Sequence, residues 1–125
     1  MPSLTPILRQ GAYLIASLQS VLTDDEWLTL RGELADRVTS ARARVVIIDV
    51  SSVELLDSFA TRMLRSIAQI TRLRGADSVI VGIAPDVAFA MVQLGLTLQG
   101  VRTALDLDDA MEQMHGHHAT QSDAR

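Results

Sequence analysis

The sequence of 125 residues predicts a single-domain α/β fold, a mixed and mostly parallel sheet of four or five strands covered by about four helices. Two observations lead to this prediction. Runs of β-branched residues too short for a helix, such as Val45-Val46-Ile47-Ile48, are typical of strands buried on both faces. Segments with apolar residues at helical spacing alternate with these runs, as in βαβ units.

The first half of the chain is expected to form two short strands, a helix and the central strand. Residues 7–18 contain two short strands broken at Gly11, where a glycine allows the positive φ of a tight turn. Thr23-Asp24-Asp25-Glu26 has the capping-box pattern, and the helix after it should end near Ser40-Ala41. The central strand follows from about Arg44 to Val50. The buried face of the helix is expected to hold Trp27, Leu30, Leu34 and Val38.

The second half continues the alternation of helices and strands. Residues 1–115 are expected to form the domain, while residues 116–125 show no periodicity and are expected to form a disordered tail. The predicted elements are a helix over 58–74 with Gly75 as its C-cap, a strand over 78–83, a helix from Pro85 closed by Gly95, a short strand around 101–103, and a helix from its N-cap Asp106 to Met114.

Composition excludes several kinds of function. The chain has no cysteine, and all eleven basic residues are arginines, so thiolate chemistry, a catalytic lysine and a lysine-dependent phosphate loop are ruled out. A net charge of −4 without a basic block argues against nucleic-acid binding. No apolar run reaches the ~18 residues of a membrane-spanning helix, and the N-terminus does not resemble a signal peptide. A cytoplasmic protein that binds no membrane is therefore expected.

Metal and cofactor sites are not expected either. His115, His117 and His118 could ligate a metal as neutral imidazoles, but no pair of them shares a face of a rigid predicted helix. No nucleophile–base pair or glycine-rich phosphate loop is present. We therefore predict no catalytic residues, no cofactor and no metal.

The candidate functional site lies where the central strand meets the second helix. Ser58 should begin this helix beyond the carboxyl end of a central strand, the region where α/β sheets tend to bind ligands and partners. Asp57 is expected to cap the helix and also to orient the serine hydroxyl or contact a partner. Asp49 is expected to satisfy loop amides. One helix face, either a docking stripe for an acidic partner or a solvated outer face, contains Arg62, Arg65, Gln69 and Arg72.

Residues 49–58 have the pattern Asp-Φ-Ser-x-Val-x-Φ-Φ-Asp-Ser, where Φ is apolar. With the order of the elements, this pattern resembles the STAS domain, over nearly the whole chain from about Ile7 to Met114. Within that family, Asp57-Ser58-Phe59-Ala60 and residues 82–88 are similar to the RsbS and RsbR group of the stressosome. Serine at position 58, where RsbR-type proteins usually have threonine, favours the RsbS group.

The resemblance implies a non-enzymatic scaffold controlled by phosphorylation of Ser58, with Asp57, Asp49, Phe59, Arg62 and Arg65 as the partner-binding neighbourhood. The implied partners are an RsbT-type switch serine kinase, which is sequestered and then released, RsbR-type paralogues in a large hetero-oligomer, and a phosphatase. A homodimer is an option for the isolated protein. The alternatives are a free-standing antagonist of an anti-sigma factor kinase, similar to SpoIIAA, and a ligand-binding or transport-accessory STAS domain.

Overall fold

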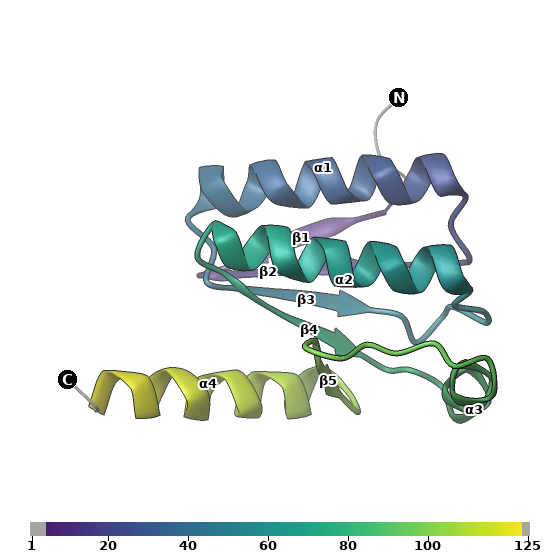
Figure 1. Cartoon of the computed structure of the whole chain (residues 1–125). Helices are drawn as coiled ribbons and strands as arrows, with labels where there is room; N and C mark the ends of the chain where they lie inside the picture. Colours follow the sequence, from purple (N-terminus) through teal and green to yellow (C-terminus); the bar gives the residue numbers. More distant parts are fainter. Residues whose placement is uncertain (1–4, 124–125) are drawn as a thin grey trace.

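A computed structural model describes the backbone of residues 5–123 and the side chains of residues 5–115. This part of the chain forms five strands and four helices, and after two initial strands helices and strands alternate, as expected from the sequence (Figure 1). In chain order they are β1 (Ile7–Gln10), β2 (Tyr13–Ser17), α1 (Asp24–Ala41), β3 (Val45–Asp49), α2 (Ser58–Leu73), β4 (Asp77–Val81), α3 (Pro85–Gln93), β5 (Arg102–Ala104) and α4 (Leu107–Asp123).

The five strands form one sheet in the order β1-β2-β3-β4-β5. Strand β1 is antiparallel to β2, and the other neighbours are parallel, so the sheet is mixed and mostly parallel. The register places Ser17 beside Asp49 and Asp49 beside Val81, which brings the carboxyl ends of β2, β3 and β4 together. The loops that follow these three strands therefore meet at one end of the domain.

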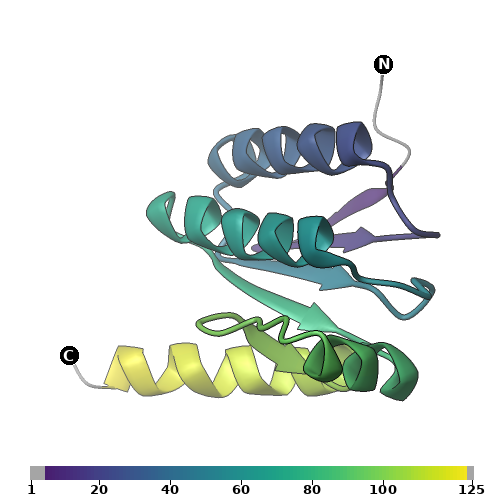
Figure 2. The same ribbon diagram turned by 45° about the vertical axis from the view of Figure 1, so that its right-hand side comes forward.

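Helices cover both faces of the sheet. Helices α1 and α2 lie side by side over one face, and α4 crosses the other, as Figures 1 and 2 show from two directions. Successive residues of β3 serve the two faces in turn: Val46 and Ile48 join the core under α1 and α2, whereas Val45 and Ile47 pack under α4. All four are fully buried, which confirms a central strand buried on both faces.

The ends of helix α1 follow the sequence signals. Thr23 accepts a hydrogen bond from the Glu26 amide while Glu26 reaches back to the Thr23 amide, so the predicted capping box is confirmed. At the other end Arg42 adopts the left-handed conformation (φ 51°), and the Ala43 amide donates to the Val38 carbonyl at 3.0 Å. This is a Schellman-type end with an arginine where glycine is usual. The predicted core face is confirmed too, with four buried residues, Trp27, Leu30, Leu34 and Val38.

Two predicted boundaries are wrong by two residues or more. The strand expected to reach Ile83 ends at Val81, because Gly82 turns the chain away at a φ of 80°. The last helix continues to Asp123 instead of ending at Met114. Gly116 does not stop it, since one interior glycine costs only about 1 kcal/mol relative to alanine. The division into a domain of residues 1–115 and a tail of residues 116–125 stays a prediction, because the tail side chains and the backbone of 124–125 lie outside the described residues.

Candidate functional site

The loop between β3 and α2 is held in place by its own side chains. The Asp49 carboxylate accepts a hydrogen bond from the Ser51 amide at 2.9 Å, as expected for a residue that satisfies loop amides. Val53 and Leu56 are buried in the core under α1 and α2. The residues between these anchors have little freedom, so the start of α2 has a fixed position at the carboxyl end of the sheet.

The loop also rests against the end of the neighbouring strand β4. A Cβ added at Gly82 would lie 2.8 Å from the Ser51 Cβ, a distance that real Cβ atoms do not tolerate. The Val50 amide meanwhile donates to the Val81 carbonyl at 2.9 Å. Only a residue without a side chain allows this close approach. Because the contact joins residues far apart in sequence, the spacing of neighbouring residues gave no sign of it.

Ser58 is the first residue of α2 and is exposed. The residue before it, Asp57, is the N-cap: its carboxylate accepts a hydrogen bond from the Ala60 amide at 2.8 Å, which confirms the capping role. The Thr61 hydroxyl donates to the Asp57 carbonyl at 2.8 Å and strengthens the first turn. The proposed contact of Asp57 with a partner stays a prediction.

A shallow groove of about 340 Å³ opens beside Ser58, between α2 and the segment that follows α3. We call it the Ser58 groove. Two segments line the groove. Helix α2 contributes Ser58, Thr61, Arg62 and Arg65, and the segment after α3 contributes Gly95, Leu96 and Thr97. Sequence reasoning missed the second wall, since only the helix-ending role of Gly95 was visible.

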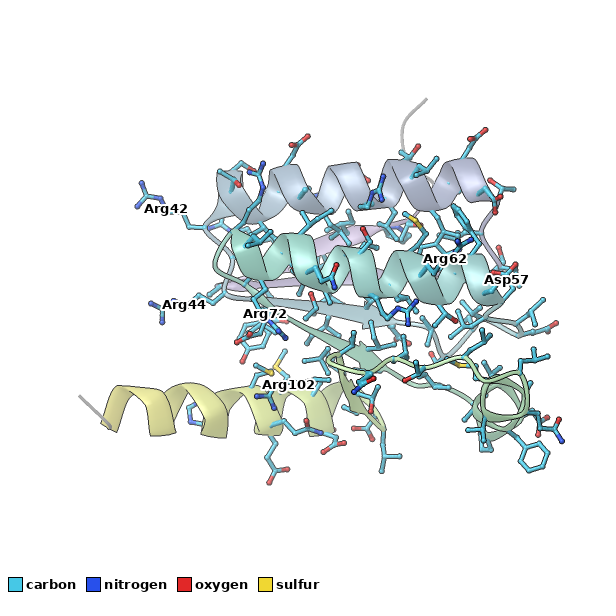
Figure 3. All side chains as sticks on the ribbon, viewed as in Figure 1. Arg42, Arg44, Asp57, Arg62, Arg72 and Arg102 are labelled. Carbon is cyan, nitrogen blue, oxygen red and sulfur yellow. The ribbon has the colours of Figure 1, made fainter. Side chains whose placement is uncertain are left out.

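The arginines on α2 have three different surroundings. The Arg62 guanidinium lies over the Phe59 ring, 5.8 Å from its centroid, near the Asp57 end of the helix (Figure 3). Arg65 donates to the Thr97 carbonyl at 3.3 Å, and Arg72, at the opposite end of the helix, donates to the Gly100 carbonyl at 3.3 Å. Arg65 and Arg72 therefore hold the segment before β5 against α2. This role differs from both expected ones, a docking stripe and a solvated outer face.

The reactive group that Ser58 offers at this site is an exposed hydroxyl. Among residues 5–115, no group of three or more histidines, cysteines or acidic residues could hold a metal ion. The Asp57 carboxylate accepts a hydrogen bond from the Ala60 backbone amide, and none of the hydrogen bonds among the described residues involves the Ser58 hydroxyl. Ser58 is exposed, so another protein can reach its hydroxyl. No helix within the described part of the chain is long and apolar enough to cross a membrane.

The fold and the site define a small α/β domain with an exposed serine at a helix start, beyond the carboxyl end of a parallel sheet. Residues 7–110 match the family model of the STAS domain, and the chain belongs to this family. Among curated relatives in Bacillus subtilis strain 168, the RsbT co-antagonist protein RsbRA is 30% identical across 61% of this chain and 31% of the relative. RsbRD is 25% identical across 66% of this chain and 30% of its own. The chain thus spans about a third of the length of these relatives.

Solved structures give the same assignment. The S58E variant of RsbS from Moorella thermoacetica is 30% identical, with a TM-score of 0.79 over 94% of this chain and 99% of that one. A chain of the stressosome structure is 29% identical, with a TM-score of 0.73 over 90% of this chain and 98% of that one. Unphosphorylated SpoIIAA shares the fold alone, since its identity is 9% at a TM-score of 0.68. The chain is therefore similar to STAS proteins of the stressosome type.

Proposed function

We propose that this chain is a non-enzymatic regulatory scaffold of a stressosome-like complex, which sequesters an RsbT-type serine kinase and releases it when Ser58 is phosphorylated. The observation that carries the proposal is the exposed Ser58 at the first position of α2. It is supported by the likeness to RsbS over nearly the whole length of both chains. The inferred setting is the cytoplasm.

The local physical chemistry supports a phosphorylation switch at Ser58. A phosphoryl group adds roughly −1.5 to −2 charges at pH 7. The amides of Ser58 and Phe59 lie in the first turn, where a helix offers no internal acceptor, so the helix start tolerates an anion. A docked partner, in contrast, would face a surface that already carries Asp57 and Glu54, both exposed. Phosphorylation should therefore weaken binding of the kinase without unfolding the domain.

The proposed partners follow the same reasoning. RsbR-type STAS paralogues would co-assemble with the chain in a large hetero-oligomer, and a phosphatase would reset the serine. The kinase would contact the residues around the modified hydroxyl. These residues are Asp49, Asp57, Phe59, Arg62 and Arg65.

Phosphosite mapping with an RsbT-type kinase and ATP tests the proposal. Wild-type protein should incorporate phosphate at Ser58, and the Ser58→Ala variant should lose that incorporation. Ser52→Ala is the matched control, since Ser52 is an exposed serine in the same loop and should leave incorporation unchanged. Strong incorporation into Ser58→Ala would place the modification elsewhere. Equal affinity of the kinase for phosphorylated and unmodified protein would contradict the switch.

A free-standing antagonist of an anti-sigma factor kinase is the second candidate. Its support is the fold shared with SpoIIAA over 90% of this chain and 98% of that one. Co-expression with an RsbR-type paralogue distinguishes the two functions by size. A scaffold should elute in a particle far larger than the 13.6 kDa chain, whereas a free-standing antagonist should remain a monomer or dimer.

A further inference from the structure

Two arginines, Arg62 and Arg65, line the groove together with Ser58. Arg62 lies one turn beyond Ser58 on the same helix, and Arg65 lies one turn further. Thr61 also lines the groove. Side chains on a helix lean toward its N-terminus, so both arginines extend in the direction of Ser58. The pair Ser58 and Arg62 has the i, i+4 spacing at which helical side chains meet.

Neither arginine is neutralised by a carboxylate in the part of the chain that the structure describes. Arg62 contacts the face of the Phe59 ring, and Arg65 donates to the neutral carbonyl of Thr97. The segment across the groove, residues 94–100, contains no ionisable side chain at all. The carboxylate nearest in sequence to Ser58, that of Asp57, is already hydrogen-bonded to the Ala60 amide. Among the described residues, those that line the groove include two arginines and no acidic side chain, so the groove itself carries positive charge.

We infer that the Ser58 groove is a phosphate-monoester site for the chain's own phosphoserine, with Arg62 as its main ligand and Arg65 as its second. The inference rests on the proposed phosphorylation of Ser58. Charge-assisted bonds between an arginine and a phosphate are about twice as strong as bonds between neutral groups. Arg62 therefore turns from the Phe59 ring to the phosphate, and Arg65 exchanges the Thr97 carbonyl for a phosphate oxygen.

This exchange gives phosphorylation a second readout inside the domain. The segment before β5 has two ties to α2, one from Arg65 to Thr97 and one from Arg72 to Gly100. Only the first tie lies in the groove. Phosphorylation therefore loosens residues 95–97 and leaves the Gly100 end of the segment in place.

Phosphoserine placed at position 58 during translation allows a test without any kinase. Titration by ³¹P NMR should show that Arg62→Gln raises the second pKa of the phosphoserine by a few tenths of a unit, because the dianion loses an i, i+4 cation. Arg65→Gln should raise this pKa by less. Arg72→Gln is the matched control, because Arg72 also ties α2 to a loop carbonyl but does not line the groove. This variant should leave the pKa of the phosphoserine unchanged.

Backbone amide spectra supply the second measurement. Phosphorylation should shift the amide signals of residues 95–97 in wild-type protein, and Arg65→Gln should abolish most of that shift, while the Gly100 amide stays in place in both. Unphosphorylated spectra of each variant verify that it folds. Equal pKa values in Arg62→Gln and Arg72→Gln, or unmoved amides at 95–97, would overturn the inference. If the kinase failed to phosphorylate Ser58, the proposed function would be wrong. The spectra of the protein with phosphoserine introduced during translation would still test the phosphate site.

Discussion

The carboxyl and amino ends of the parallel strands differ in charge. At the carboxyl end α1 and α4 begin with acidic first turns, and the cap of α2 is Asp57. At the amino end, Figure 3 shows four labelled arginines on the opposite side of the domain from Asp57. They are Arg42, Arg44, Arg72 and Arg102. Crossover helices run against the strands, so their N-termini collect at the carboxyl end and favour acids there.

The difference between the two ends is therefore largely a consequence of helix geometry, and charge alone does not mark the functional end. Helix α2 follows that pattern only at its cap, Asp57. Its first turn contains no acidic residue, whereas α1 has three and α3 and α4 have one and two. Instead, Arg62 follows immediately and faces the Ser58 groove. The proposed phosphate site therefore rests on this feature of α2 and not on the general difference in charge between the two ends.

The largest predicted contrast between the ends concerns two glycines with nearly the same φ. Gly82, at the carboxyl end, has a φ of 80° and abuts Ser51, while Gly100, before β5, has a φ of 83° and open space around it. Gly82→Ala should lower the free energy of unfolding by about 2–4 kcal/mol, from both conformational strain and overpacking. Gly100→Ala should cost only about 1–2 kcal/mol, from strain alone. Urea denaturation measures both, and equal losses would show that the Ser51 contact is unimportant.

A smaller effect is expected from the cap of α2. Asp57→Ala should lower the free energy of unfolding by about 1 kcal/mol, because the Ala60 amide loses its acceptor. Ser58→Ala should cost less than about 0.5 kcal/mol, since Ser58 follows the cap and is exposed. Thr23→Ala, which removes the cap of α1, provides the reference, with a loss of about 1 kcal/mol. If Ser58→Ala destabilised the protein as much as Asp57→Ala, the serine would be mainly structural.

The smallest effect is predicted at the amino end. Arg42 is the only non-glycine residue with positive φ in the described part of the chain. Arg42→Gly should raise the free energy of unfolding by about 0.5 kcal/mol, because glycine adopts this conformation without strain. Arg42→Ala keeps the strain and should give no such gain. A thermal melt of the three proteins compares them directly, and a stabilised alanine variant would assign the effect to the lost charge.

Much of the fold could be predicted because its signals are local. The β-branched run at 45–48 located the central strand, and the box that starts at Thr23 located α1. The boundaries at Val81 and Asp123 were missed, since the run of apolar residues continues past Gly82 and a single glycine does not end a helix.

The site was predicted less completely. The position of Ser58 and the capping by Asp57 depend on neighbouring residues, and both were found. The spacing of Arg65 and Arg72 showed which face they share but not what lies opposite. Residues 95–97, the second wall of the groove, follow the α2 residues opposite them by about thirty residues or more, and no local pattern predicts such a contact.

The division of the core by the sheet has a consequence for the order in which the protein opens. The larger cluster lies between the sheet and α1 and α2, and the smaller one holds α4 through two fully buried residues, Ala110 and Met114, among its described side chains. Elements with few apolar anchors open as separate cooperative units in native-state hydrogen exchange. The amides of α4 should therefore exchange before those of β3 and α2. The Ser58 groove should remain folded when α4 opens.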